Sequence, residues 1–389
     1  MSNIYKRNIT LYYITRVFVA LRFIIPIWVT FFLRIITFEQ MAIGEVVALV
    51  IGTIFELPSG VLADLIGRRF TVAIGFIIQG AGYVLLSTVT SFPQYLIYYS
   101  ICAFGNSFVS GAEEALVYDS LKQDNKLSLY SHVKSIESVI YRITLLISTI
   151  IGGYLYKIKT FLPYLLTGIT IFIAGIIYLF SREPYIDTEK FSLKSYLKTF
   201  KLGFMESFKD KSNTMISIYY ILIFAGAFML MAYFEQPYTY WLGFNEVQIG
   251  WIFGLITFIR IFTVMLSVKI EKKISRKYIN FFLPFITGLF LMLSFKNTYW
   301  GLFVLTAESI VIAYRFIFTQ KAYNEVIDSK YRASAISTVT MFINIVHAVF
   351  VYFLSRLFLT RNIGYSFNVI GLLFICSAVL SLFFKTNNK

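Results

Sequence analysis

The chain has 389 residues, of which 58% are hydrophobic and only 14% are charged, and its formal net charge is +15. Soluble domains are roughly half apolar and about a quarter charged, so this composition excludes an ordinary soluble domain and indicates a membrane protein. The basic residues lie in short gaps between apolar blocks rather than on one basic face, which argues against nucleic-acid binding.

Apolar blocks long enough to span a bilayer, which needs about 20 residues, recur along the whole chain. We expect each block to be a helix, because no other isolated segment satisfies its backbone in lipid. Twelve spans are predicted, at about 9–33, 41–63, 70–89, 93–118, 133–156, 160–181, 213–241, 247–268, 276–295, 298–322, 332–354 and 363–384. The fold class is therefore an all-α membrane protein, with an N-terminal six-helix bundle (1–181), a linker (182–211) and a C-terminal six-helix bundle (212–389).

The basic residues of the loops predict how the chain crosses the membrane. They are concentrated at the N-terminus, in alternate loops, in the central segment and in the tail. By the positive-inside rule, these segments and both termini face the cytoplasm. The first block is too long for the core of a signal peptide and has no small-residue cleavage site, so we expect it to remain as an anchor in a bacterial plasma membrane.

The central linker has an amphipathic pattern. Its apolar residues recur at spacings of mostly three and four, which predicts a helix lying on the inner leaflet with its lysines toward anionic headgroups. They are Phe191, Leu193, Tyr196, Leu197, Phe200, Phe204 and Phe208.

The stretch FELPSGVLADLIGRRF, residues 55–70, interrupts the apolar pattern between the second and third spans. It contains the run Gly60-x-x-x-Asp64-x-x-Gly67-Arg68-Arg69 on the predicted cytoplasmic side. Gly60 permits a close approach of two helices, and Gly67 permits a turn that side chains disfavour. This run resembles the loop motif of the major facilitator superfamily.

The resemblance implies a secondary transporter of the small bacterial drug- or metabolite-exporter kind. In that family the acid at the position of Asp64 interacts with the positive N-terminal end of a helix from the other half. The equivalent bases pair with nearby acids and close the cytoplasmic side. The conformational latch implied for this chain consists of Gly60, Asp64, Gly67, Arg68, Arg69 and Asp119.

An internal repeat supports two related halves. A shift of 208 residues lays Arg68 and Arg69 over Arg276 and Lys277, in the loop after the eighth span, although Asp64 then falls on Lys272. A degenerate second copy is what two parallel halves that rock around a site near the middle of the membrane would show.

Ionisable residues inside spans are costly and are functional candidates by default. Glu113 and Glu114 are neighbouring acids in the fourth span, and two acids in a low dielectric favour a proton carrier. Glu137 and Arg142 are expected to form a structural ion pair in the fifth span. The proton-coupling candidates are Glu113, Glu114, Glu308 and Glu56, and the substrate-binding candidates are Arg22, Asn106, Arg260 and Arg315.

Two departures from the drug–proton antiporters of this family weaken an assignment to antiport. Many of them carry an arginine in the fourth span where this chain has Ser107. Their fifth-span motif ends Gly-Pro-x-x-Gly-Gly, and residues 148–153, STIIGG, keep only the final glycine pair. Arg22 in the first span is a candidate for the missing charge.

Competing classes have little support in the sequence. Only His132 and His347 are present, with no metal-ligand spacing and no nucleophile motif, so we expect no enzyme activity, metal or cofactor. No ring of repeated polar residues suggests a channel. A receptor that does not transport remains an alternative class of protein.

The function predicted is proton-coupled efflux of a drug-like or amphiphilic small molecule; the alternative is proton-coupled uptake or export of a small polar metabolite. The expected partners are this substrate, H⁺ and the bilayer, with the chain acting as a monomer and binding no nucleic acid.

Overall fold

The described residues of the computed structural model, 4–184, 193–271, 274–294, 298–328 and 331–383, form helices and turns with no strand among them. They fall into two compact units. Unit 1 contains Met1–Leu193 and Glu246–Gly254, and unit 2 contains Lys194–Asn245 and Leu255–Lys389. The all-α class is confirmed for this part of the chain.

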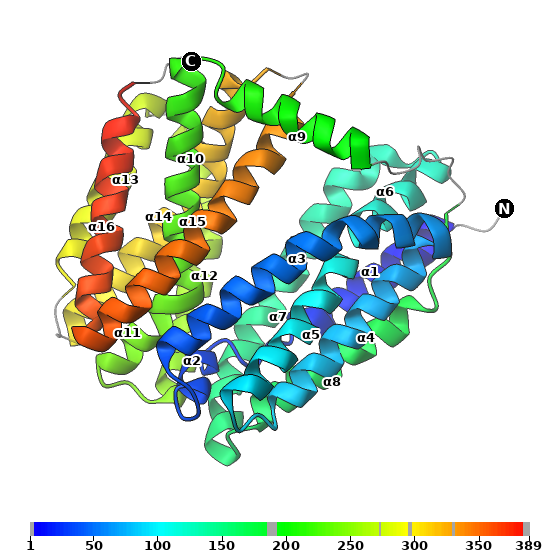
Figure 1. Cartoon of the computed structure of the whole chain (residues 1–389), viewed down its shortest axis with the longest axis horizontal. Helices are drawn as coiled ribbons and strands as arrows, with labels where there is room; N and C mark the ends of the chain where they lie inside the picture. Colours follow the sequence, from blue (N-terminus) through cyan, green and yellow to red (C-terminus); the bar gives the residue numbers. More distant parts are fainter. Residues whose placement is uncertain (1–3, 185–192, 272–273, 295–297, 329–330, 384–389) are drawn as a thin grey trace. The chain divides into compact units, whose positions relative to one another are not determined.

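Unit 1 is a bundle built around α4, which packs against α5 and α8. Small residues allow this approach: a Cβ on Gly80 would lie 2.5 Å from the backbone nitrogen of Phe172. Its helices are α1 (Ile4–Ala20), α2 (Trp28–Phe32), α3 (Phe38–Ile66), α4 (Arg68–Leu86), α5 (Phe92–Val109), α6 (Ala112–Gln123), α7 (Tyr130–Ile158) and α8 (Leu162–Tyr178) (Figure 1).

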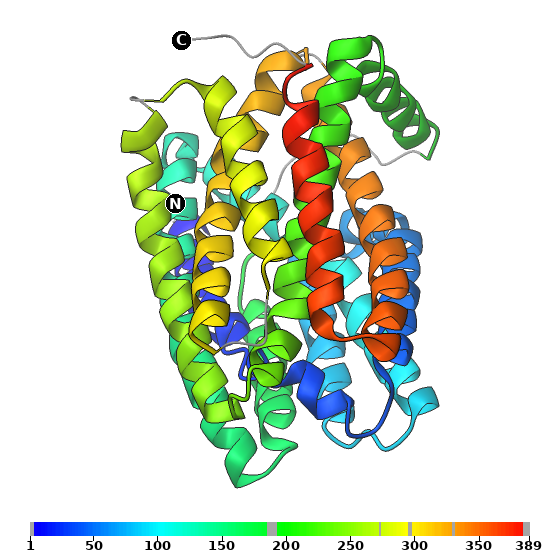
Figure 2. The ribbon, with the colours of Figure 1, turned by 90° about the vertical axis from the view of Figure 1, so that its left-hand side faces the viewer.

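Unit 2 pairs α13 with α16 in the same manner, and Figure 2 shows α16 running alongside α10. A Cβ on Gly288 would lie 2.5 Å from the carbonyl oxygen of Gly371. The helices of this part of the chain are α9 (Leu193–Ser207), α10 (Lys211–Met229), α11 (Glu235–Trp241), α12 (Glu246–Glu271), α13 (Arg276–Met292), α14 (Thr298–Val326), α15 (Arg332–Thr360) and α16 (Ile363–Leu380). A π-helical turn, Leu230–Phe234, joins α10 to α11.

The predicted linker helix exists as α9. Its C-terminal end is anchored on unit 2, where the hydroxyls of Ser207 and Tyr323 are hydrogen bonded at 3.1 Å and Gly203 packs on the carbonyl of Ser334. Phe204 and Met205 are exposed, as an apolar face toward lipid requires. The linker residues 185–192 lie outside the described residues.

Seven helices in the described part of the chain are long and apolar enough to cross a membrane, so the chain is a multi-pass membrane protein. Two shorter apolar helices, Leu162–Tyr178 and Lys277–Met292, accompany them. The count of twelve spans and the cytoplasmic placement of both termini stay predictions.

Two predicted spans are not continuous helices. The first, expected over 9–33, is broken between α1 and α2 by the turns of Leu21–Ile27. The fourth, expected over 93–118, ends at Val109, because Gly111 adopts a φ of 77° that a helix does not accommodate. The acidic residues that follow therefore lie on a separate helix, α6.

The element bounds repeat along the chain. The 208-residue shift that carries Arg68 onto Arg276 takes the first residue of α4 onto that of α13. It also carries Phe38 onto Glu246, the first residues of α3 and α12. Two helix starts of the second half therefore follow the same shift as the repeated basic pair.

Candidate functional site

The loop between α3 and α4 is a compact charged cluster. Gly67 ends α3 with a φ of 94°, a conformation that favours glycine. The carboxylate of Glu183 accepts hydrogen bonds from the amides of Arg68 at 2.7 Å and Arg69 at 2.9 Å, which satisfies the free N–H groups at the start of α4. The Arg68 guanidinium forms an ion pair with Asp119 on α6 and donates to the carbonyl of Ala115.

Two of the predicted latch residues are thus brought together within unit 1, as Arg68 with Asp119. The Arg69 side chain points elsewhere and donates to the carbonyl of Ser181 at 3.0 Å. Gly60 and Asp64 lie in α3, but the structure does not describe the surroundings of Gly60 or the side chain of Asp64. Glu183 was missed, because it lies 115 residues from Arg68 and no local spacing connects them.

A second charged cluster surrounds Glu113 in the first turn of α6. Glu113 is 5% exposed and forms an ion pair with Arg16 of α1. Tyr178 of α8 donates its hydroxyl to Oε1 of Glu113 at 2.5 Å. Nε of Arg16 lies 3.5 Å from Oε1 of Glu137 on α7, and the ring of Tyr12 lies under the guanidinium. One arginine therefore bridges two carboxylates from different helices.

The expected equivalence of Glu113 and Glu114 is not seen. The Glu114 side chain is 62% exposed, with Lys134 at 3.7 Å and the Tyr130 hydroxyl at 2.7 Å, because successive residues of a helix point to different faces. The expected pair of Glu137 with Arg142 is wrong. Glu137 faces Arg16, while Arg142 is exposed and donates to Ser138 at 3.3 Å.

The break in the first span is held by two neighbouring helices. The hydroxyl of Ser148 on α7 donates to the carbonyl of Ala20 at 3.0 Å, and the amide of Phe23 donates to the hydroxyl of Thr167 on α8 at 3.1 Å. Gly152 lies against the backbone of Phe23, where a Cβ would be 2.0 Å from the carbonyl oxygen. Backbone groups released by the break thus find partners inside the bundle, as they must in a membrane.

Arg22 occupies this break rather than the middle of a helix. The groups that act on its guanidinium electrostatically include Tyr141, Tyr83 and Tyr99. Tyr99 in turn donates its hydroxyl to Glu45 of α3 at 2.6 Å. Sequence reasoning missed Glu45, although it is an acid within the second predicted span.

Unit 2 has its own buried ion pair, close to the π-helical turn. Nη2 of Arg260 on α12 lies 2.5 Å from Oε1 of Glu235, the first residue of α11, and donates to Ser309 of α14 at 3.0 Å. Glu308 is buried beside Ser309 and acts electrostatically on Tyr238. π-Helical turns occur frequently at functional sites.

The remaining candidates are less informative. Asn106 is exposed and accepts a hydrogen bond from Gln79 at 3.4 Å. The side chains of Glu56 and Arg315 lie outside the described residues. Among the residues that the structure describes, no group of three His, Cys, Asp or Glu side chains could hold a metal ion.

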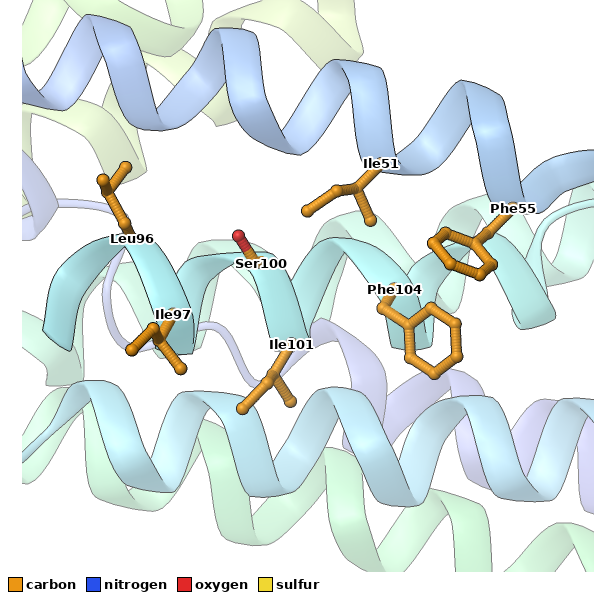
Figure 3. A pocket seen from close by; sticks show the side chains of 7 residues that line it. All are labelled: Ile51, Phe55, Leu96, Ile97, Ser100, Ile101 and Phe104. Atoms are coloured by element: carbon orange, nitrogen blue, oxygen red, sulfur yellow. The ribbon is translucent and has the colours of Figure 1, made fainter. Parts of the chain in front are cut away.

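An open apolar groove of about 460 Å³ runs along α3 and α5 in unit 1 (Figure 3). The rings of Phe55 and Phe104 meet edge to face at one end, with centroids 4.7 Å apart. Ser100 is the one polar residue of its lining, and the others are Ile51, Phe55, Leu96, Ile97, Ile101 and Phe104.

The structure describes a helical membrane protein with buried charges, and sequence comparison identifies its family. The sequence model of the Major Facilitator Superfamily matches residues 13–351, so the chain belongs to this family.

One relative is the uncharacterized MFS-type transporter YxaM of Bacillus subtilis, 25% identical over 64% of this chain and 63% of the relative. The chain thus matches less than two thirds of that relative's length. Among solved structures, the nucleoside transporter NupG superposes with a TM-score of 0.74 at 15% identity, over 98% of each chain. A bacterial homolog of the human lysosomal transporter Spinster, inward-facing and occupied, gives 0.71 at 12% identity, over 98% of this chain and 96% of that one. These structural likenesses show the fold.

Proposed function

We propose that the chain is a proton-coupled secondary transporter that works by alternating access and exports an amphiphilic small molecule. The observation that carries the proton coupling is the buried Glu113 carboxylate, held by Arg16 and Tyr178. Burial disfavours the charged form of a carboxylate and a neighbouring cation favours it, so the position of Arg16 decides whether Glu113 holds a proton.

The geometry offers a way to exchange that proton. Arg16 lies between Glu113 and Glu137. When Glu113 is protonated, Glu137 is the carboxylate that still forms an ion pair with the Arg16 guanidinium. Protonation removes the negative charge of Glu113, while Arg16 keeps its positive charge. A change in pairing between helices α1, α6 and α7 is a local event that an alternating-access cycle can use.

The apolar groove of α3 and α5 supports an amphiphilic substrate over a sugar, because its lining offers one hydroxyl. Arg22 with its three tyrosines favours the second candidate function, uptake or export of a small polar metabolite. Both candidates share the coupling site at Glu113.

The charged loop between α3 and α4 completes the proposal. We propose that Arg68, Asp119 and Glu183, together with Asp64, form the conformational latch on the cytoplasmic side. The chain would act as a monomer in a bacterial plasma membrane, with bundles at 1–181 and 212–389 and both termini in the cytoplasm.

The test uses proteoliposomes that contain a pH-sensitive dye. Drug-like cations, amphiphilic acids and nucleosides are added in turn, and the substrate-induced pH change is recorded. We expect Glu113→Gln to abolish the proton flux while Glu114→Gln, the exposed neighbour on the same turn, keeps it. Undiminished flux in Glu113→Gln at equal reconstitution would contradict the coupling assignment.

A further inference from the structure

The first spanning segment of each half departs from α-helical geometry at the same position. In unit 1 the helix is broken at Leu21–Ile27, and in unit 2 a π-helical turn, Leu230–Phe234, lies inside the continuous helical stretch Lys211–Trp241. The shift that carries Arg68 onto Arg276 carries 21–27 onto 229–235. Irregular helix geometry of either kind is frequent at functional sites, and interrupted membrane helices point to a transporter's binding site.

The two positions differ in how their charge is balanced. In unit 2, Glu235 lies next to the π-helical turn and forms an ion pair with Arg260 at 2.5 Å. In unit 1, the break holds Arg22, and no carboxylate among the described residues pairs with it. Its Nε is buried and has no hydrogen-bond partner within the described part of the chain. Arg22 therefore lies at this break without a direct ion-pair partner among the described residues.

The surroundings of Arg22 suit an anion. Tyr83 and Tyr141 present hydroxyls, which can donate to an anionic oxygen. The nearby carboxylate of Glu45 is engaged with the Tyr99 hydroxyl at 2.6 Å. Arg16 is also near, but it is neutralised by Glu113 and Glu137. Arg22 itself has no carboxylate partner among the described residues.

The unwound backbone keeps Arg22 at this place. Ser148 and Thr167 bind the backbone on both sides of it, at Ala20 and Phe23. The side chain therefore departs from a turn fixed at two points rather than from a regular helix. A preorganised cation is what recognition of a carboxylate or phosphate requires, because guanidinium donates two parallel hydrogen bonds to such groups.

We propose that Arg22 binds an anionic oxygen group, a carboxylate or a phosphate, of the transported substrate, with the hydroxyls of Tyr83 and Tyr141 as further donors. This inference rests on the proposed transport function and assigns its substrate class: an organic anion or a zwitterion with an exposed acidic group. Neutral compounds of the same shape are poor ligands, because they leave the buried guanidinium uncompensated.

The experiment measures binding to the purified full chain in detergent micelles, without any proton gradient. The probes are 3-phenylpropanoate, phenyl phosphate and the neutral ester methyl 3-phenylpropanoate, and the readout is the concentration dependence of the thermal unfolding midpoint. We expect stabilisation by an acid probe and none by the ester. The acid probe that stabilises the protein at the lower concentration shows whether the site prefers a carboxylate or a phosphate.

Variants tie the effect to Arg22. Arg22→Gln should weaken acid binding by about 10- to 100-fold, the loss expected for a charge-assisted hydrogen bond. Arg22→Lys should keep part of the affinity, and Tyr141→Phe should lose a few-fold. Arg142→Gln, which removes an exposed arginine from α7, is the matched control and should bind like wild type.

Equal binding of acid and ester, no acid-dependent stabilisation by any probe, or unchanged binding in Arg22→Gln would each overturn the inference. The proposed function is tested separately by proton flux through Glu113. If the protein moves protons but binds acid and ester equally, the proposed anion site is refuted and the proposed transport function is retained.

Discussion

The contact between Gly152 and the broken first span gives the sharpest structural prediction. A Cβ added at Gly152 would lie 2.0 Å from the carbonyl oxygen of Phe23, 2.9 Å from its carbonyl carbon and 3.1 Å from its Cα. These are backbone atoms and cannot turn aside as a flexible side chain can. Gly152→Ala must therefore push α7 away from the Leu21–Ile27 segment by about an ångström.

The expected cost has two parts. Overpacking of a well-packed interior costs about 1–3 kcal/mol. Separation of α7 also stretches the hydrogen bond from Ser148 to the carbonyl of Ala20, 3.0 Å long, which contributes about 0.5–1.5 kcal/mol. We expect Gly152→Ala to lower the free energy of unfolding by roughly 1.5–4.5 kcal/mol.

The assay is equilibrium unfolding of the purified chain in mixed micelles, followed by the loss of helical circular dichroism. Gly52→Ala is the matched control: Gly52 lies in α3, and a Cβ there would meet no atom within 4 Å. It should be neutral or stabilise by up to about 1 kcal/mol, because alanine is the better helix former. If Gly152→Ala proves as stable as Gly52→Ala, the close approach of α7 to the break is refuted.

Two further predictions concern charges. Glu235→Gln should lower the free energy of unfolding by about 3–5 kcal/mol, because it leaves the Arg260 guanidinium buried and unpaired. The double variant Glu235→Gln/Arg260→Gln should recover much of that loss in a double-mutant cycle, and strict additivity would argue against the pair. Glu183→Ala should cost about 0.5–2 kcal/mol by removing the cap of α4. The amides of Arg68 and Arg69 should then exchange hydrogen faster while those at the start of α8 do not, and unchanged exchange at Arg68 would contradict the cap.

Much of the fold was predictable from the sequence, since helix formation in lipid follows from local hydropathy. Each predicted apolar block overlaps helical residues, and most of the amphipathic linker pattern falls on α9, Leu193–Ser207. The breaks were not predicted. Pro26 lies in the first break, but Pro58 and Pro284 lie inside α3 and α13 without ending them, so proline alone does not mark an interruption.

The candidate site was predictable only as a set of residues. Glu113, Asp119 and Arg22 stand out because ionisable groups are rare in apolar blocks. Their partners do not stand out: Glu137 pairs with Arg16 rather than with its near neighbour Arg142.

The sequence by itself determined the family of this protein and its helical architecture, because hydropathy and the loop motif are local properties of the chain. Tertiary structure alone decided which charges meet. Arg16 and Glu113 are 97 residues apart, and Arg68 and Glu183 are 115 apart, so only the packing of helices brings them into contact. The same packing gives Arg22 no ion-pair partner among the described residues and supports a broken helix with hydroxyls from α7 and α8. The physical reason is that a buried charge or a free backbone group must be satisfied by whatever lies beside it in space, and sequence distance has no part in that choice.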